Sequence, residues 1–172
     1  MQTVTSSDML REQTLVRLVN DYQAVLLKVC YMHLKDEEQA RDAVQETFIK
    51  AYRALAQFRG ESSEKTWLVR IAINVCRDMQ RTGWFRHVDR RITPEELPEA
   101  ALQPDAEDVE LTIAIMALPV KYREVVLLYY YQNMGVAEVA RALGIAQSSV
   151  SNRLKRAREK LRADLERRNR HA

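Results

Sequence analysis

Apolar residues recur at intervals of three or four positions in three segments of the first half of the chain. This spacing places them on one face of a helix, so it predicts amphipathic helices over residues 10–34, 37–55 and 67–80. Between the second and third helices, residues 57–65 break the pattern, and Gly60, Ser62 and Ser63 there are turn and helix-capping residue types. The predicted core positions are Leu15, Leu18, Val19, Tyr22, Leu26, Val29, Cys30, Ala40, Val44, Thr47, Phe48, Ala51, Leu55, Leu68, Ile71, Ala72, Val75 and Met79.

A second group of helical patterns begins near residue 109. Between the two groups, residues 84–109 lose the period and contain three prolines among acidic residues, a composition typical of a linker. Helical patterns then cover residues 109–117, 122–132, 136–143 and about 147–167. Pro119 separates the first of these from the second. We therefore predict an all-α protein with two small helical domains, residues 1–83 and 110–172, joined by a flexible linker at 84–109.

The distribution of charge suggests a partner for the second domain. The net charge of the chain is only +3, but residues 111–172 hold 12 Lys/Arg against 5 Asp/Glu, whereas residues 84–110 hold 3 against 8. A basic domain that follows an acidic linker indicates binding to phosphate groups. The presence of only four glycines and four prolines favours helices over a turn-rich β fold.

Residues that commonly carry catalysis or bind metals are few. Cys30 and Cys76 lie within predicted helices and are interpreted as reduced, buried side chains rather than as a bridge or a sensor. His33, His87 and His171 are scattered without metal-ligand spacing, and no glycine-rich phosphate loop is present. We therefore predict no cofactor, no metal and no enzymatic activity. The sequence shows neither an export signal nor a membrane-spanning run, so we expect a cytoplasmic protein.

Residues 136–155 carry the pattern of a helix-turn-helix. The motif needs a small residue where the first helix abuts the second, a turn residue that tolerates left-handed geometry, and a branched apolar residue between the helices. Ala140, Gly144 and Val150 stand at the fifth, ninth and fifteenth places of the segment, where these requirements fall. Further core contacts are expected from Val139, Leu143 and Leu154.

The second helix of this motif has a polar and basic face. Asn and Arg side chains can make paired hydrogen bonds to adenine and guanine in the major groove. The same residues could form an ordinary solvated face, but the coincidence of the turn chemistry with the basic face favours DNA binding. The predicted DNA-contacting residues are Gln147, Ser148, Ser149, Ser151, Asn152, Arg153, Lys155, Arg156 and Arg158.

The two halves of the chain resemble the extracytoplasmic-function (group IV) sigma factors of the sigma-70 family. Residues 42–55 and 58–78 resemble region 2 of these proteins, and residues 117–128 followed by the helix-turn-helix resemble region 4. The resemblance covers about residues 10–83 and 110–165 in the correct order, and region 3 of the larger sigma factors has no counterpart. It implies a sigma factor that binds core RNA polymerase and recognises the −10 and −35 promoter elements.

The resemblance also implies roles for individual residues. The polar face of the second helix would dock on the clamp helices of the largest polymerase subunit, through Asp42, Gln45, Glu46, Ile49 and Arg53. The following loop would capture an unstacked base of the −10 element, and the third helix would support that loop or hold the melted strand. These residues are Phe58, Arg59, Gly60, Glu61, Ser62, Ser63, Lys65, Trp67, Arg70, Asn74, Arg77 and Arg81. The helix-turn-helix would read the −35 element, with the flap region of the polymerase as a further partner.

Some alternatives stay open at this point. Trp67 either contacts a base or packs as a core aromatic, and Ser62 and Ser63 either meet DNA or cap the third helix. The group Trp84, Phe85 and Arg86 fits DNA contact or packing equally well, and residues 129–131, three successive tyrosines, should place one or two rings in the core and at least one outside. The basic surfaces of the free protein would be masked by packing of the two domains on each other or by an anti-sigma factor, and the resemblance favours the anti-sigma factor.

Three other functions compete with this interpretation. A helix-turn-helix repressor or activator with a helical sensing domain would bind an operator alone and usually as a dimer, but no dimerisation heptad is evident. An enzyme would need acid–base catalysis, and with three scattered histidines this would depend on acidic residues that lie in surface-like helical patterns. A third alternative is a protein whose C-terminal helix binds only another protein. Replacing Arg153 or Arg156 would then leave DNA affinity unchanged.

Overall fold

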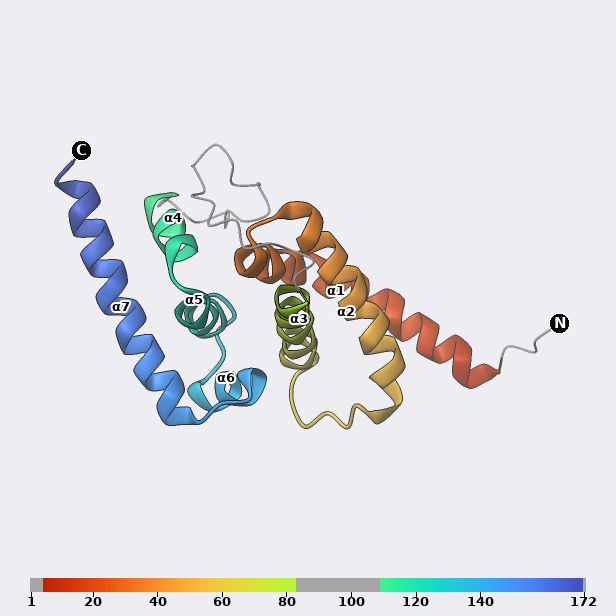
Figure 1. The fold of residues 1–172 in the computed structure, drawn as a ribbon. Helices are drawn as coiled ribbons and strands as arrows, with labels where there is room; N and C mark the ends of the chain where they lie inside the picture. The colour runs from red at the N-terminus through yellow and green to blue at the C-terminus, as the bar shows by residue number, and fades with distance from the viewer. Residues whose placement is uncertain (1–4, 83–108, 172) are drawn as a thin grey trace.

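The computed structural model describes residues 5–82 and 109–171, and every regular element in those residues is helical (Figure 1). The first three helices form what we call the N-terminal bundle, and the remaining helices form the C-terminal module. The bundle consists of α1 (Ser6–Leu34), α2 (Glu37–Ala54) with the short 3-10 turn η1 (Leu55–Gln57), and α3 (Glu64–Arg81). The module consists of α4 (Val109–Ala117), α5 (Val120–Val126) with the π-helical turn η4 (Leu127–Tyr131), α6 (Val136–Leu143) and α7 (Gln147–Asn169). The prediction of an all-α fold with two helical units is confirmed.

Side-chain caps set where the helices of the bundle begin. Thr5 and Asp8 form a reciprocal capping box, so α1 starts four residues before the apolar pattern does. The Asp36 carboxylate accepts a hydrogen bond from the Gln39 amide at 2.9 Å and starts α2. Ser63 caps α3 in the same way, which is why this helix begins at Glu64 rather than at residue 67.

The three helices of the bundle pack on one another around the predicted apolar stripes. Most predicted core positions are buried. Six are only partly buried at the edge of the core, namely Leu15, Val19, Tyr22, Leu55, Ile71 and Met79. The N-terminal part of α1 extends beyond the other two helices (Figure 1). It carries the exposed apolar side chains Met9, Leu10 and Val16.

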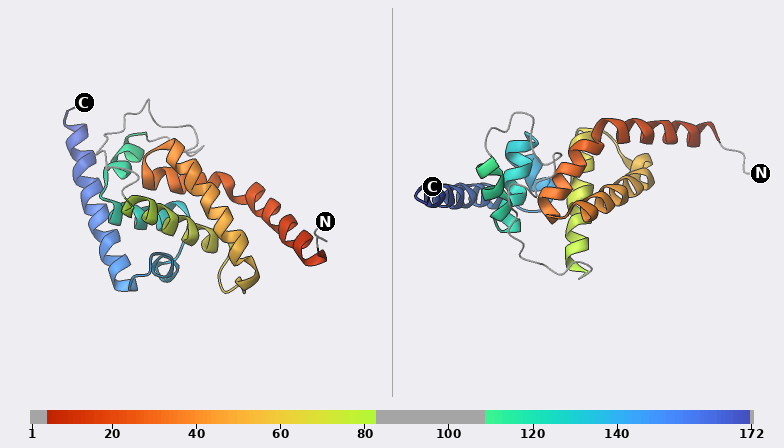
Figure 2. Two further views of the ribbon diagram at one scale, coloured as in Figure 1. Left: turned by 45° about the vertical axis from the view of Figure 1, so that its right-hand side comes forward. Right: turned by 90° about the horizontal axis from the view of Figure 1, so that it is seen from above.

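Helix α7 is the support of the C-terminal module, because α4, α5 and α6 all pack against it. It lies on the side of the module that faces away from the N-terminal bundle, as the views of Figures 1 and 2 agree. Among the three successive tyrosines, Tyr130 is 48% exposed and meets Tyr129 edge to face, whereas Tyr129 and Tyr131 are partly buried. The expectation of at least one exposed ring is therefore confirmed, whereas the other two rings pack against the core without being fully buried in it.

The bundle and the module are in direct contact. Helix α3 packs against α6, and α1 touches α5, so the buried apolar residues of both units form one continuous cluster. The Lys28 ammonium of α1 also lies 5.5 Å from the centre of the Tyr131 ring. The predicted linker, including Trp84, Phe85 and Arg86, lies outside the described residues except for Val109, which is already part of α4.

None of the helices in residues 5–82 and 109–171 is both long and apolar enough to cross a membrane.

Candidate nucleic-acid interface

Helices α6 and α7 form the helix-turn-helix that the sequence predicts. Gly144 adopts the left-handed conformation, with φ +65°, and ends α6. The Ile145 amide then donates to the Ala140 carbonyl at 3.0 Å, which closes the turn. The predicted inter-helix contacts are all buried, namely Val139, Ala140, Leu143, Val150 and Leu154. This core fixes the angle at which α7 presents its opposite face to solvent.

The polar face of α7 is open along its first three turns. Gln147, Ser148, Ser151, Asn152, Lys155, Arg156 and Arg158 are exposed, whereas Ser149 and Arg153 are partly buried. Two of the arginines interact with neighbouring side chains and still remain exposed. Arg156 Nη1 lies 3.5 Å from Glu159 Oε2, and Arg158 donates to the Tyr130 hydroxyl at 3.0 Å. An exposed ion pair such as Arg156–Glu159 contributes little free energy, so this guanidinium group can be redirected to a ligand.

A second polar face lies on α3 and the loop before it. Arg70, Asn74 and Arg81 are exposed on this helix, and Arg81 pairs with Asp78 at 3.0 Å. Arg77 shares the face but is held by the C-terminal module, as described below. The sequence therefore predicted the common face of these residues correctly, but not the different environment of Arg77.

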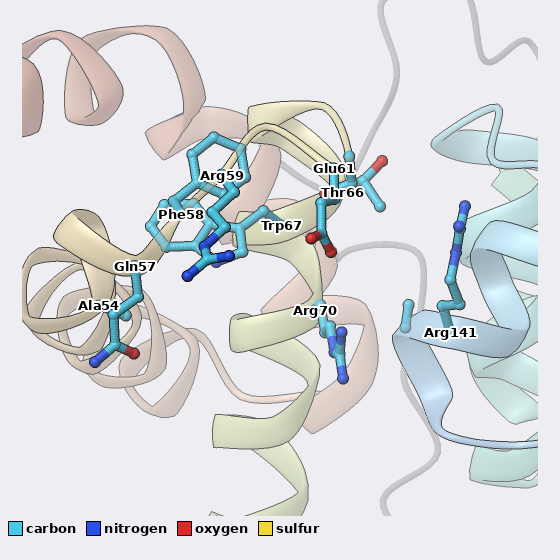
Figure 3. A pocket seen from close by; sticks show the side chains of 11 residues that line it. Ala54, Gln57, Phe58, Arg59, Glu61, Thr66, Trp67, Arg70 and Arg141 are labelled. Atoms are coloured by element: carbon cyan, nitrogen blue, oxygen red, sulfur yellow. The ribbon is translucent and has the colours of Figure 1, made fainter.

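The loop before α3 borders a polar pocket of about 450 Å³ between the two units (Figure 3). The Phe58 and Trp67 rings stack within it, with centroids 4.5 Å apart. Gly60 has φ +70°, which the turn requires, and Ser63 caps α3 by accepting a hydrogen bond from the Thr66 amide at 3.0 Å. The pocket is lined by Ala54, Gln57, Phe58, Arg59, Glu61, Ser62, Thr66, Trp67, Arg70, Arg141 and Ala142.

This geometry bears on the alternatives for Trp67 and the two serines. Trp67 is partly buried through its stack on Phe58 and also lines the pocket, so its ring has one packed face without being enclosed in the core. Ser63 is a helix cap, whereas Ser62 lines the pocket. Arg141 and Ala142 belong to α6, so the C-terminal module closes one side of the pocket (Figure 3).

The predicted docking residues form a continuous exposed strip on α2. Asp42, Gln45, Ile49 and Arg53 are exposed and Glu46 is partly exposed. Ile49 is 41% exposed although it is aliphatic. The strip borders a groove of about 550 Å³ between α1 and α2, lined by Leu15, Val19, Gln23, Arg41, Val44, Gln45, Phe48, Ile49, Tyr52 and Arg53. An apolar groove with charged edges is the usual character of a protein-binding surface.

A buried ionic network joins the two units, and sequence reasoning missed it. Glu124 of α5 is 3% exposed, and one of its oxygens lies 2.7 Å from His33 Nε2 on α1. Arg77 of α3 grips both Glu124 oxygens, through Nε at 3.1 Å and Nη2 at 3.0 Å, and its Nη1 donates to the Leu143 carbonyl at 3.0 Å. The neighbouring Arg123 is also buried, and donates to the His33 carbonyl at 3.0 Å.

Charge is stabilised within this network by its hydrogen bonds. Burial alone raises the pKa of Glu124, but the hydrogen bonds and charges of His33 and Arg77 outweigh burial and hold this pKa at about 2. Burial lowers the pKa of Arg123 to about 10, and the Glu124 carboxylate opposes this effect. Both side chains are therefore charged near neutral pH. Glu124 lies 47 residues after Arg77 and 91 residues after His33, so the group leaves no local pattern in the sequence.

The two cysteines are free and buried, as predicted. A hydrogen bond with Cys30, together with burial, raises the pKa of Cys76, which keeps this thiol protonated and unreactive.

Comparison with known protein families gives two matches that follow the two structural units. The model of Sigma-70 region 2 matches residues 18–86, and the model of Sigma-70, region 4 matches residues 109–161.

Curated proteins and solved structures resemble the chain over most of its length. The chain is 33% identical to the RNA polymerase sigma-H factor of Pseudomonas aeruginosa, over 83% of this chain and 81% of that protein. It is 30% identical to the ECF RNA polymerase sigma factor SigW of Bacillus subtilis, over 86% and 87% of the two chains. The structure of CnrH in complex with the cytosolic domain of CnrY superposes with a TM-score of 0.67 at 30% identity, covering 90% and 89% of the two chains. The sigma factor RpoE in its complex with the anti-sigma factor NepR, from Bartonella quintana, shares the fold with a TM-score of 0.64 at 22% identity, over 90% and 96% of the chains.

Proposed function

This chain belongs to the extracytoplasmic-function group of the sigma-70 family and is an RNA polymerase sigma factor, and we propose that its two units divide promoter recognition between them. Sigma factors are transcription initiation factors rather than enzymes. In our proposal, residues 1–83 bind core polymerase and the −10 element, residues 110–172 bind the −35 element, and residues 84–109 connect them. The observation that carries the division is the presence of two separate polar faces, one on α3 with its loop and one on α7.

The proposal for the −35 element is supported by the exposure and chemistry of α7. Ser148, Asn152, Lys155 and Arg156 share one exposed face, and the helix-turn-helix core holds the helix rigidly behind it. A helix presented in this way fits the major groove, where Asn and Arg can each pair with a base edge. Helices that read bases are positioned by phosphate contacts, and the basic residues farther along α7 supply them.

The proposal for the −10 element is supported by the pocket beside α3. An unstacked base needs an aromatic or polar pocket, and the strand that carries it needs a positive groove. The stacked Phe58 and Trp67 rings and the adjacent Arg59 and Arg70 meet the two requirements. We propose that Trp67 forms one wall of the base pocket through the face that does not meet Phe58.

Polymerase docking is assigned to the exposed strip of α2 and the groove beside it. The apolar Ile49 lies within a charged surface, which favours a protein partner over DNA. The partner proposed for this strip is the clamp-helix segment of the largest polymerase subunit, with the flap region binding the C-terminal module. An anti-sigma factor is a further proposed partner, supported by the relatives that were solved as complexes.

Binding to core polymerase tests the docking surface. Replacing Glu46 or Ile49 by Ala should weaken binding by about tenfold, because such side chains contribute on the order of 1–2 kcal/mol at an interface. Glu166→Ala, an exposed acid of α7, is the matched control and should bind as wild type. Circular dichroism would check that each variant is folded. Unchanged affinity in both docking variants would remove this strip from the proposal.

Transcription in vitro tests the whole assignment. The purified chain with core polymerase and a library of random promoters should yield transcripts that share two sequence elements. The chain without polymerase should not select those elements from the same library, whereas an independent repressor or activator would.

A further inference from the structure

The folded chain holds together two surfaces that promoter binding must separate. The carbonyl of Leu143 is 3.0 Å from Arg77, and α7 begins only four residues later, so its first turn is within roughly 15 Å of Leu143 along the chain. On a promoter, elements centred near −35 and −10 are about 25 base pairs apart, which is about 85 Å of B-DNA. The arrangement of the two units in this structure therefore cannot engage both elements at once.

The contact between the units also occupies a group proposed to bind DNA. The guanidinium of Arg77 makes a two-pronged contact with the Glu124 carboxylate, which is the geometry that Arg uses for phosphate. Its remaining nitrogen donates to the Leu143 carbonyl. Its side chain is 34% exposed but all three nitrogens are engaged by the C-terminal module.

The environment of Glu124 makes this contact a stable one. The carboxylate is buried and charged, and it has hydrogen bonds from two elements of the other unit, α1 and α3. Arg123 adds a second connection by donating to the His33 carbonyl. Leaving a carboxylate buried without its partners costs free energy. Glu124 must therefore leave Arg77 and His33 together or remain bound to both.

The first helix of the helix-turn-helix covers the proposed −10 surface as well. Arg141 and Ala142 of α6 line the pocket that contains Phe58, Trp67 and Arg70 (Figure 3). Ala142 is buried although it lines this pocket. In this arrangement a DNA strand running along α3 would meet α6.

We infer that Glu124 is an autoinhibitory latch: it takes the place of a promoter phosphate on Arg77 and holds the C-terminal module over the −10 surface of the free protein. The inference rests on the proposed function, because it assigns Arg77 to the melted strand. Opening of the latch releases Arg77 and allows α7 to move to the distance of the −35 element. Binding to polymerase or DNA must therefore supply the free energy that separates the two units.

Small-angle scattering of the full chain tests the latch. The variant Glu124→Gln keeps the shape of the side chain but loses the charge, and should increase the radius of gyration by several ångströms relative to wild type. Glu166→Gln makes the same charge change on exposed α7 and should leave the radius unchanged.

Binding to a labelled single-stranded DNA of random sequence, about 20 nucleotides long, tests whether the latch masks Arg77. Glu124→Gln should bind about tenfold more tightly than Glu166→Gln, measured by fluorescence anisotropy. The double variant Glu124→Gln/Arg77→Gln should lose this gain although it remains open.

A second variant covers the case in which Glu124→Gln does not fold, as judged by circular dichroism. Ala142→Glu places a charged side chain between α6 and the bundle, and should open the molecule and tighten DNA binding despite its added negative charge. An unchanged radius in the folded variants would overturn the latch. Opening without tighter DNA binding would overturn the masking of Arg77. Loss of the sigma function itself would appear separately, as failure of the wild-type chain to bind core polymerase.

Discussion

Helices α3 and α7 both carry Asn and Arg at helical spacing, but their polar faces meet different surroundings. Helix α7 lies at the outer edge of the molecule (Figure 1), and Asn152 and Arg156 are exposed on it. The face of α3 borders the junction of the two units, so Arg77 is bound by Glu124 although Asn74 on the same face is exposed. The comparison teaches that the same residue types in the same pattern differ in availability according to what the fold places opposite them.

The largest expected effect comes from breaking the junction at Arg123. Its guanidinium donates to the carbonyls of Met116, Leu118 and His33, all of which are buried. Arg123→Ala would leave these acceptors unsatisfied and should lower the free energy of unfolding by about 3–4 kcal/mol, measured by urea denaturation. Arg162→Ala, on the exposed part of α7, should change it by less than about 0.5 kcal/mol. Similar losses in the two variants would show that the junction contributes no more than an exposed helix.

The next effect is a pH dependence of the free energy of unfolding, which arises from Glu124 at the junction and not from α7. The pKa of Glu124 in the folded chain is about 2, below the ordinary 4.5, so its ionised form stabilises the fold. That contribution, on the order of 3 kcal/mol, is complete above pH 4.5 and is lost as the pH falls from 4.5 towards 2. Unfolding free energies of wild type and Glu124→Gln between about pH 5 and about pH 3 measure it.

The result of that experiment is the difference between wild type and Glu124→Gln in the unfolding free energy lost on acidification. Other acids titrate in the same range in both proteins, so only the difference between them reports on Glu124. The wild type should lose more stability than Glu124→Gln on acidification. An equal loss would mean that the Glu124 carboxylate is not stabilised by its partners.

The smallest effect tests whether the exposed polar side chains of α7 contact bases. Asn152→Ala or Arg156→Ala should weaken binding to the −35 element by about 1–3 kcal/mol if the side chain pairs with a base. Neither change should alter stability, because both side chains are exposed. Promoter DNA and scrambled DNA would be compared by anisotropy with the polymerase holoenzyme. An equal loss on scrambled DNA would assign the residue to phosphate contact alone.

Local features of the fold were predictable from the sequence because each depends on neighbouring residues. The apolar periods located the helices of both units, and the φ of Gly144 follows from the helix-turn-helix pattern. Where the predictions were displaced, the reason was also local. Helices α1 and α3 begin earlier than expected because Thr5 and Ser63 cap them.

The candidate site was predictable only in part. The sequence grouped Arg70, Asn74, Arg77 and Arg81 on one face, since helical spacing determines which side chains are aligned. It did not identify His33, Arg123 or Glu124 as a group, because helical periodicity relates residues within one helix and these come from α1 and α5. A signal existed in the pair Arg123 and Glu124, two charged residues directly before a buried apolar run, and such residues need partners when they are buried.

By itself, the sequence determined the helical class, the family and the residue types available on each face. Periodicity, capping and turn conformation act over a few residues, so they can be derived without a partner. The tertiary structure alone decided that the two units pack through α3 and α6 and that Arg77 is bound while Arg156 is open. Burial of a charge depends on the groups that meet it from distant parts of the chain, and only the folded arrangement brings Glu124 to Arg77.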